Sequence, residues 1–106
     1  MATPLPDSDH RITLNDAVRI TTARRQADAG AGELPFAFHR NGLDRLLGQA
    51  QCVGIRAYPA QQDDGTHVWV LVGVDSAGND MANGELAEEP FLCPPVCADA
   101  NPLNGG

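Results

Sequence analysis

Residues 52–75 read CVGIRAYPAQQDDGTHVWVLVGVD, and this stretch decides the fold of the chain. Apolar residues alternate with other residues on both sides of its centre, which predicts strands over Cys52–Tyr58 and His67–Val74. Between them, Asp64 and Gly65 suit a two-residue type I′ turn, because both central residues of that turn have positive φ. The stretch therefore predicts an antiparallel β-hairpin.

The expected turn also fixes which side chains share a face of the hairpin. It pairs Ala57 with Val72 and Ile55 with Val74, since the register of a hairpin follows from its turn. One face then holds apolar side chains and is the expected floor for helices: Val53, Ile55, Ala57, Val70, Val72 and Val74. The other face is partly polar and aromatic and carries Arg56, Tyr58, His67, Trp69 and Leu71.

Two helices are expected before the hairpin. Thr13 can cap the first, which continues to about Ala27 and ends at the glycine- and alanine-rich connector of residues 29–32. Asn41 can cap a second, short helix. Its expected buried stripe consists of Leu43, Leu46, Leu47 and Ala50. The fold class is therefore α+β, with two N-terminal helices packed on a small antiparallel hairpin sheet and an irregular, cysteine-containing C-terminal tail.

A length of 106 residues fits one domain. We expect a flexible lead-in over residues 1–11, a single domain over 12–97 with one further short strand near Glu85–Ala87, and a flexible tail over 98–106. No apolar run reaches the roughly 20 residues that span a bilayer. The first residues lack the basic start and apolar stretch of an export signal, so a cytoplasmic location without membrane contact is expected.

The charges are unevenly distributed. The chain has fourteen acidic residues, seven arginines and no lysine, and its net charge is −7. Residues 57–106 contain eight of the acids and no cation. Nucleic-acid binding is therefore not expected, because it needs clustered cations to neutralise phosphates. The acidic half could attract a basic partner or a cation, or simply keep the surface solvated.

Three motifs occur together in this chain: CVGIRAY at residues 52–58, VLVGVD at 70–75 followed by Gly78-Asn79-Asp80, and CPPVC at 93–97. With them come a helix that opens Ile-Thr-Leu at residues 12–14 and a later leucine-rich helix. This combination resembles a group of small uncharacterised bacterial proteins, and the resemblance covers about residues 12–97. It implies no activity, because none is known for the group.

The cysteines are the main candidates for chemistry. Cys93 and Cys97, together with Cys52 and either His67 or His39, could form a Cys₃His zinc site. Apart from this possible zinc ion, no cofactor is expected. Alternatively, Cys93 and Cys97 could cycle between dithiol and disulfide. The third interpretation is structural: Cys52 is a small buried residue. The other two then hold the tail by packing or by a short-loop disulfide.

The expected polar and aromatic face is the candidate interaction surface, formed by Arg56, Tyr58, Trp69 and Leu71. Trp, Tyr and Arg are the residue types that dominate binding hot spots. No acid–base pair or phosphate-binding loop is apparent, so no catalytic residue is proposed. The sequence therefore favours a non-enzymatic accessory or protein-interaction module that binds a protein partner or itself. The alternative function is metal binding or thiol redox chemistry at the three cysteines.

Overall fold

The computed structural model describes residues 1–28 and 35–105. They fall into two compact units, one made of Met1–Asp7 and Ala37–Phe91 and the other of Ser8–Phe36 and Leu92–Gly106. The range 12–97, expected as one domain, contributes to both units. The expected connector over residues 29–32 lies outside the described residues.

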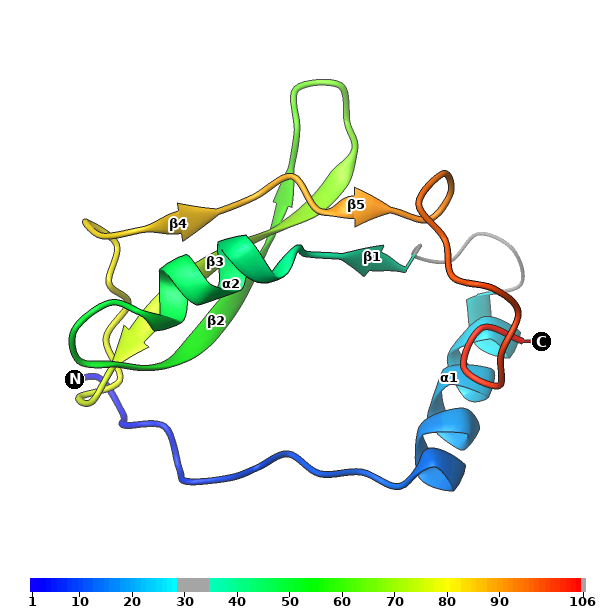
Figure 1. The fold of residues 1–106 in the computed structure, drawn as a ribbon, viewed down its shortest axis with the longest axis horizontal. Helices are drawn as coiled ribbons and strands as arrows, with labels where there is room; N and C mark the ends of the chain where they lie inside the picture. The colour runs from blue at the N-terminus through cyan, green and yellow to red at the C-terminus, as the bar shows by residue number, and fades with distance from the viewer. Residues whose placement is uncertain (29–34, 106) are drawn as a thin grey trace. The chain divides into compact units, whose positions relative to one another are not determined.

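The first unit, called the sheet unit below, contains a three-stranded antiparallel sheet (Figure 1). Its strands are β2 (Cys52–Gln61), β3 (His67–Asp75) and β4 (Leu86–Ala87), in that spatial order. The expected hairpin and the expected short third strand are both present. Strand β2 forms one edge of the sheet, which accommodates Pro59, a residue without a backbone N–H to donate.

The register of the hairpin differs from the expected one. The N–H of Gln62 donates to Thr66 O at 2.9 Å, and the N–H of Gly65 donates to Gln62 O at 2.9 Å. Gly65 has φ +90°, so the strands are joined by a three-residue loop that ends in a left-handed glycine. Ala57 therefore pairs with Leu71, one residue away from the predicted Val72.

This shift changes the composition of both faces, because side chains alternate along a strand. Arg56 now lies opposite Val72, and Tyr58 lies opposite Val70. His67, Trp69 and Leu71 lie on the other face, together with Ile55 and Ala57. The predicted grouping of Arg56 and Tyr58 with Trp69 and Leu71 on one face is wrong.

Helix α2 (Arg40–Leu47) covers the Leu71 face of the sheet. Leu46 is fully buried against Leu71 and Ala87, and Phe38, Leu43 and Ile55 pack around them. Leu47, expected in the buried stripe, is 50% exposed. The predicted cap is also wrong, because His39 caps the helix: its Nδ1 accepts a hydrogen bond from the N–H of Asn41 at 3.1 Å.

The N-terminal residues 1–7 cover part of the opposite face, where Val72 and Val74 are buried. A Cβ built on Gly54 would lie 2.7 Å from Leu5 Cδ1, and one built on Gly78 would meet the backbone of Thr3. Residues 1–7 were expected to be a flexible lead-in. That flexibility stays a prediction; in the structure Leu5 lies against Gly54 and Thr3 against Gly78.

In the second unit, α1 (Leu14–Asp28) begins as expected, because Thr13 Oγ1 accepts a hydrogen bond from the N–H of Asp16 at 3.1 Å. Near its end, the Arg25 guanidinium donates to Leu103 O at 2.5 Å. Leu103 belongs to residues 98–106, the segment expected to be a flexible tail. Packing of α1 on the hairpin stays a prediction, since α1 belongs to the second unit.

Two short strands, β1 (Phe36–Ala37) and β5 (Phe91–Leu92), pair in a separate two-stranded sheet. Among residues 1–28 and 35–105, no helix has the length and apolar character that crossing a membrane requires.

Candidate functional site

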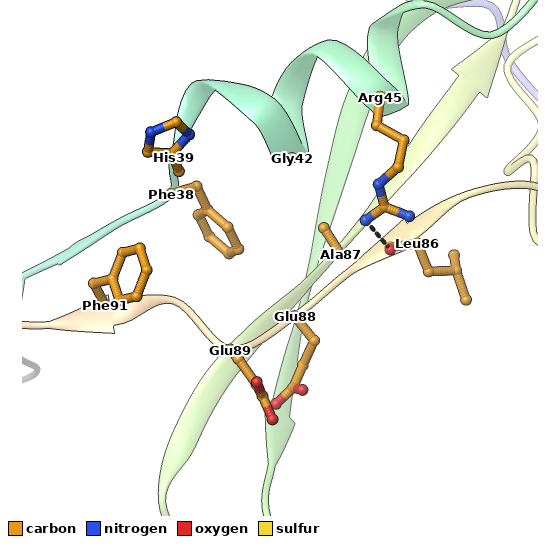
Figure 2. A pocket seen from close by; sticks show the side chains of 9 residues that line it. All are labelled: Phe38, His39, Gly42, Arg45, Leu86, Ala87, Glu88, Glu89 and Phe91. Atoms are coloured by element: carbon orange, nitrogen blue, oxygen red, sulfur yellow. Dashed lines mark hydrogen bonds between the residues drawn. The ribbon is translucent and has the colours of Figure 1, made fainter.

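The sheet unit contains a hollow of about 220 Å³ between the start of α2 and the segment that runs from β4 to Phe91 (Figure 2). Much of its lining is apolar, with contributions from Phe38, Ala87 and Phe91. Phe38 is half-buried against the core, whereas Phe91 is 51% exposed. The hollow therefore presents an exposed aromatic ring above a floor that the core holds in place.

An ion pair fixes one side of this hollow. Nη1 of Arg45 on α2 lies 2.5 Å from Glu85 Oε2, and Nη2 of the same side chain donates to Leu86 O at 2.8 Å. Gln49 adds a third link, because its Oε1 accepts from the N–H of Glu85 at 2.9 Å. These bonds hold β4 against α2, and they leave the Arg45 charge already compensated.

Two carboxylates on the lining lack such compensation. Glu88 accepts a hydrogen bond from the neutral side chain of Gln62 at 2.8 Å. Both Glu88 and Glu89 are exposed, and in Figure 2 their side chains extend to the same side of the segment after β4. No arginine in the described part of the chain forms an ion pair with either. The hollow is therefore apolar inside and negatively charged along this border.

His39 supplies the remaining polar lining group. Its Nδ1 accepts a hydrogen bond from the α2 backbone, so in the neutral ring the proton is on Nε2. This nitrogen can donate one hydrogen bond to a bound group. The side chain thus caps the helix and offers a polar contact beside Phe38.

A second polar cluster lies on the opposite face of the sheet. Arg56 Nη1 is 2.5 Å from Asp80 Oδ1, and the Tyr58 hydroxyl donates to Asp80 Oδ2. The bond from Tyr58, together with Arg56, lowers the pKa of Asp80. The same Tyr58–Asp80 bond, and then desolvation, raises the pKa of Tyr58. Asp80 is therefore an anion and Tyr58 a neutral donor at neutral pH, an arrangement that fastens β2 to the turn after β3.

The observed strand register places the residues of the predicted interaction surface on two opposite faces of the sheet. Arg56 and Tyr58 belong to the cluster with Asp80 on one face. Trp69 and Leu71 lie on the other face, where Leu71 is only 7% exposed and packs in the core beneath α2. A partner cannot contact these four side chains as one patch.

The predicted metal ligands are also separated. Cys52 pairs with Asp75 at one end of the hairpin and His67 pairs with Gln61 at the other, so these two side chains are not neighbours. Cys93 and Cys97 form a disulfide, with their Cα atoms 4.8 Å apart. The described residues contain no group of three His, Cys, Asp or Glu side chains placed to hold a metal ion.

The hollow was not predicted from the sequence. Phe38 and Phe91 are 53 positions apart and come together only through the packing of α2 and β4 on the sheet. The adjacent Glu88 and Glu89 are visible in the sequence, but nothing local shows that they border an apolar hollow. No protein-family model matches the chain, and no curated protein or solved structure matches it either.

Proposed function

We propose that this chain is a non-enzymatic protein-interaction module whose docking site is the hollow between α2 and the β4–Phe91 segment. The observation that carries the proposal is the half-exposed ring of Phe91 beside an apolar floor. Small-molecule sites usually measure about 300–1,000 Å³. A hollow of about 220 Å³ is better matched to one inserted side chain of a partner polypeptide.

The bonds around Arg45 support this function. They hold β4 on α2 before any partner arrives, so the site is largely preformed and binding costs little ordering of the chain. A module of this kind needs neither a cofactor nor a catalytic group. A cytoplasmic location is part of the same proposal.

A displayed library of random peptides tests the docking site. We expect the unaltered protein to select a consensus that contains one bulky apolar anchor, and Phe91→Ser to lose it. Val53→Ser is the matched control, because Val53 is 58% exposed in the same unit but does not line the hollow. It should retain the consensus. Absence of any consensus, or its survival in a folded Phe91→Ser protein, refutes this function.

The disulfide favours one second candidate, a thiol-redox function. Cys93 and Cys97 close a five-residue loop, and Cys97 is exposed to solvent. Reduction would transfer two electrons and two protons from a dithiol of a partner to the Cys93–Cys97 bond. The partner's dithiol becomes a disulfide, and Cys93 and Cys97 become free thiols. Zinc binding at the same pair would require this reduced state, since bonded sulfurs are not thiolate ligands.

Equilibration with dithiol buffers of defined potential, followed by alkylation and mass measurement, tests the redox candidate. A midpoint within the cytosolic range of about −320 to −220 mV supports it. A pair that stays oxidised below that range is a structural disulfide. Zinc titration of the reduced protein, with Cys93→Ser as the comparison, tests the metal alternative in the same samples.

A further inference from the structure

We infer that the segment bound in this hollow is basic: a bulky apolar side chain enters it, and a neighbouring arginine or lysine of the partner pairs with Glu88 and Glu89. This inference rests on the proposed function and specifies the chemistry of the partner. It also draws on the charge of the whole sheet unit.

The sheet unit carries nearly all of the net charge of the chain. It contains nine acidic residues and three arginines, which leaves −6 of the total of −7. Two of the arginines are already paired, Arg45 with Glu85 and Arg56 with Asp80. A field of this sign draws a cationic segment toward the unit and repels an acidic one.

The positions of the two carboxylates direct that general attraction to one place. Glu88 follows Ala87 on the floor of the hollow, and Glu89 is separated from the exposed Phe91 ring by a single residue (Figure 2). In Figure 2 both carboxylates extend from the segment on the side away from α2, so a partner residue next to the inserted anchor has to pass the edge of the segment to pair with them. The hydrogen bond from Gln62 orients Glu88 without neutralising it.

Arginine meets these requirements better than lysine. Its planar guanidinium can bond a carboxylate through two parallel N–H groups, and it can also lie against the face of an aromatic ring such as Phe91. Contact with the ring adds a cation–π attraction. Glu88 and Glu89 offer the first kind of contact, and the exposed Phe91 ring offers the second.

Three fluorescent peptides of matched length test the inference: acetyl-GSWRRSG, acetyl-GSWQQSG and acetyl-GSWEESG, with binding measured by anisotropy. We expect the arginine peptide to bind about tenfold tighter than the glutamine peptide, the effect of roughly one charge-assisted hydrogen bond. The glutamate peptide should bind weakest. The arginine advantage should shrink as salt is raised, because part of it comes from exposed charges.

A pair of double variants separates a local contact from general attraction. Glu88→Gln with Glu89→Gln should remove the advantage of the arginine peptide. Asp7→Asn with Asp44→Asn changes the net charge of the same unit equally, at exposed carboxylates that do not line the hollow, and should preserve most of it. If both double variants lose the advantage equally, the pairing with Glu88 and Glu89 is refuted.

The outcomes also distinguish this inference from the function on which it rests. If the three peptides bind equally and Phe91→Ser abolishes that binding, the basic partner is refuted but the docking site is supported. Binding by none of the three overturns the basic partner. The library selection then decides whether the hollow takes another kind of segment.

Discussion

Truncation of Leu46 tests whether one small cluster holds α2 on the sheet. Leu46 is fully buried and packs against Leu71 and Ala87. Leu46→Ala removes three buried carbons, at about 0.8 kcal/mol each, and leaves a cavity that adds to the loss. We expect the free energy of unfolding to fall by about 3–4 kcal/mol. That is a large part of the roughly 5–15 kcal/mol that stabilises a typical domain.

Urea denaturation measures this loss, and the single tryptophan, Trp69 in β3, reports unfolding of the sheet unit. The urea midpoint should fall by more than about 1 M, given a typical slope of 1–3 kcal/mol per molar. Leu47→Ala is the matched control, because the same side chain one position later is 50% exposed. It should cost less than about 1 kcal/mol. Equal losses in the two variants would refute the packing described for α2.

Four further predictions concern single features of the fold. Gly65→Ala should cost about 1 kcal/mol, because φ is +90° there. Gly42→Ala, inside α2 with no atom within 4 Å of a new Cβ, should raise the free energy of unfolding by up to about 1 kcal/mol. Urea denaturation measures both changes. The lowered pKa of Asp80 favours its ionised form in the folded state, so this stability is present above about pH 4 and is lost as the pH falls below it. Asp80→Asn should flatten that acid limb in tryptophan-monitored unfolding across pH, and an unchanged limb would contradict it. Reduction of the Cys93–Cys97 disulfide should lower the stability of the second unit by about 2 kcal/mol, the entropy of a five-residue loop. Circular dichroism with and without reductant measures this, and the double serine variant should not respond.

Local features of the fold could be read from neighbouring residues. The cap of the first helix at Thr13, the two long strands and the short strand at Leu86–Ala87 all appear where the sequence predicted them. Each depends on side chains within a few positions of one another. The start of α2 was placed less well, because His39 does the capping that Asn41 was expected to do.

The candidate site was less predictable because it depends on distant residues. Arg56 and Tyr58 were singled out correctly as a pair on one face, but their partner Asp80 follows β3 by a turn. Phe38, Phe91 and the two glutamates meet only when α2 and β4 pack on the sheet. No spacing within the sequence predicts that these residues lie close together.

What the sequence determined by itself was therefore the α+β class, the hairpin and the acidic charge of the second half of the chain. The register, and with it the residues on each face, was decided only by the tertiary structure. Alternation of apolar and polar residues specifies a register when one face of the strand is polar. In β3 both faces carry buried apolar residues, Val68, Val72 and Val74 on one face and Leu71 on the other. A slip of one residue then exchanges one apolar face for another. The choice depended on a three-residue loop, on Leu46 over one face and on residues 1–7 over the other.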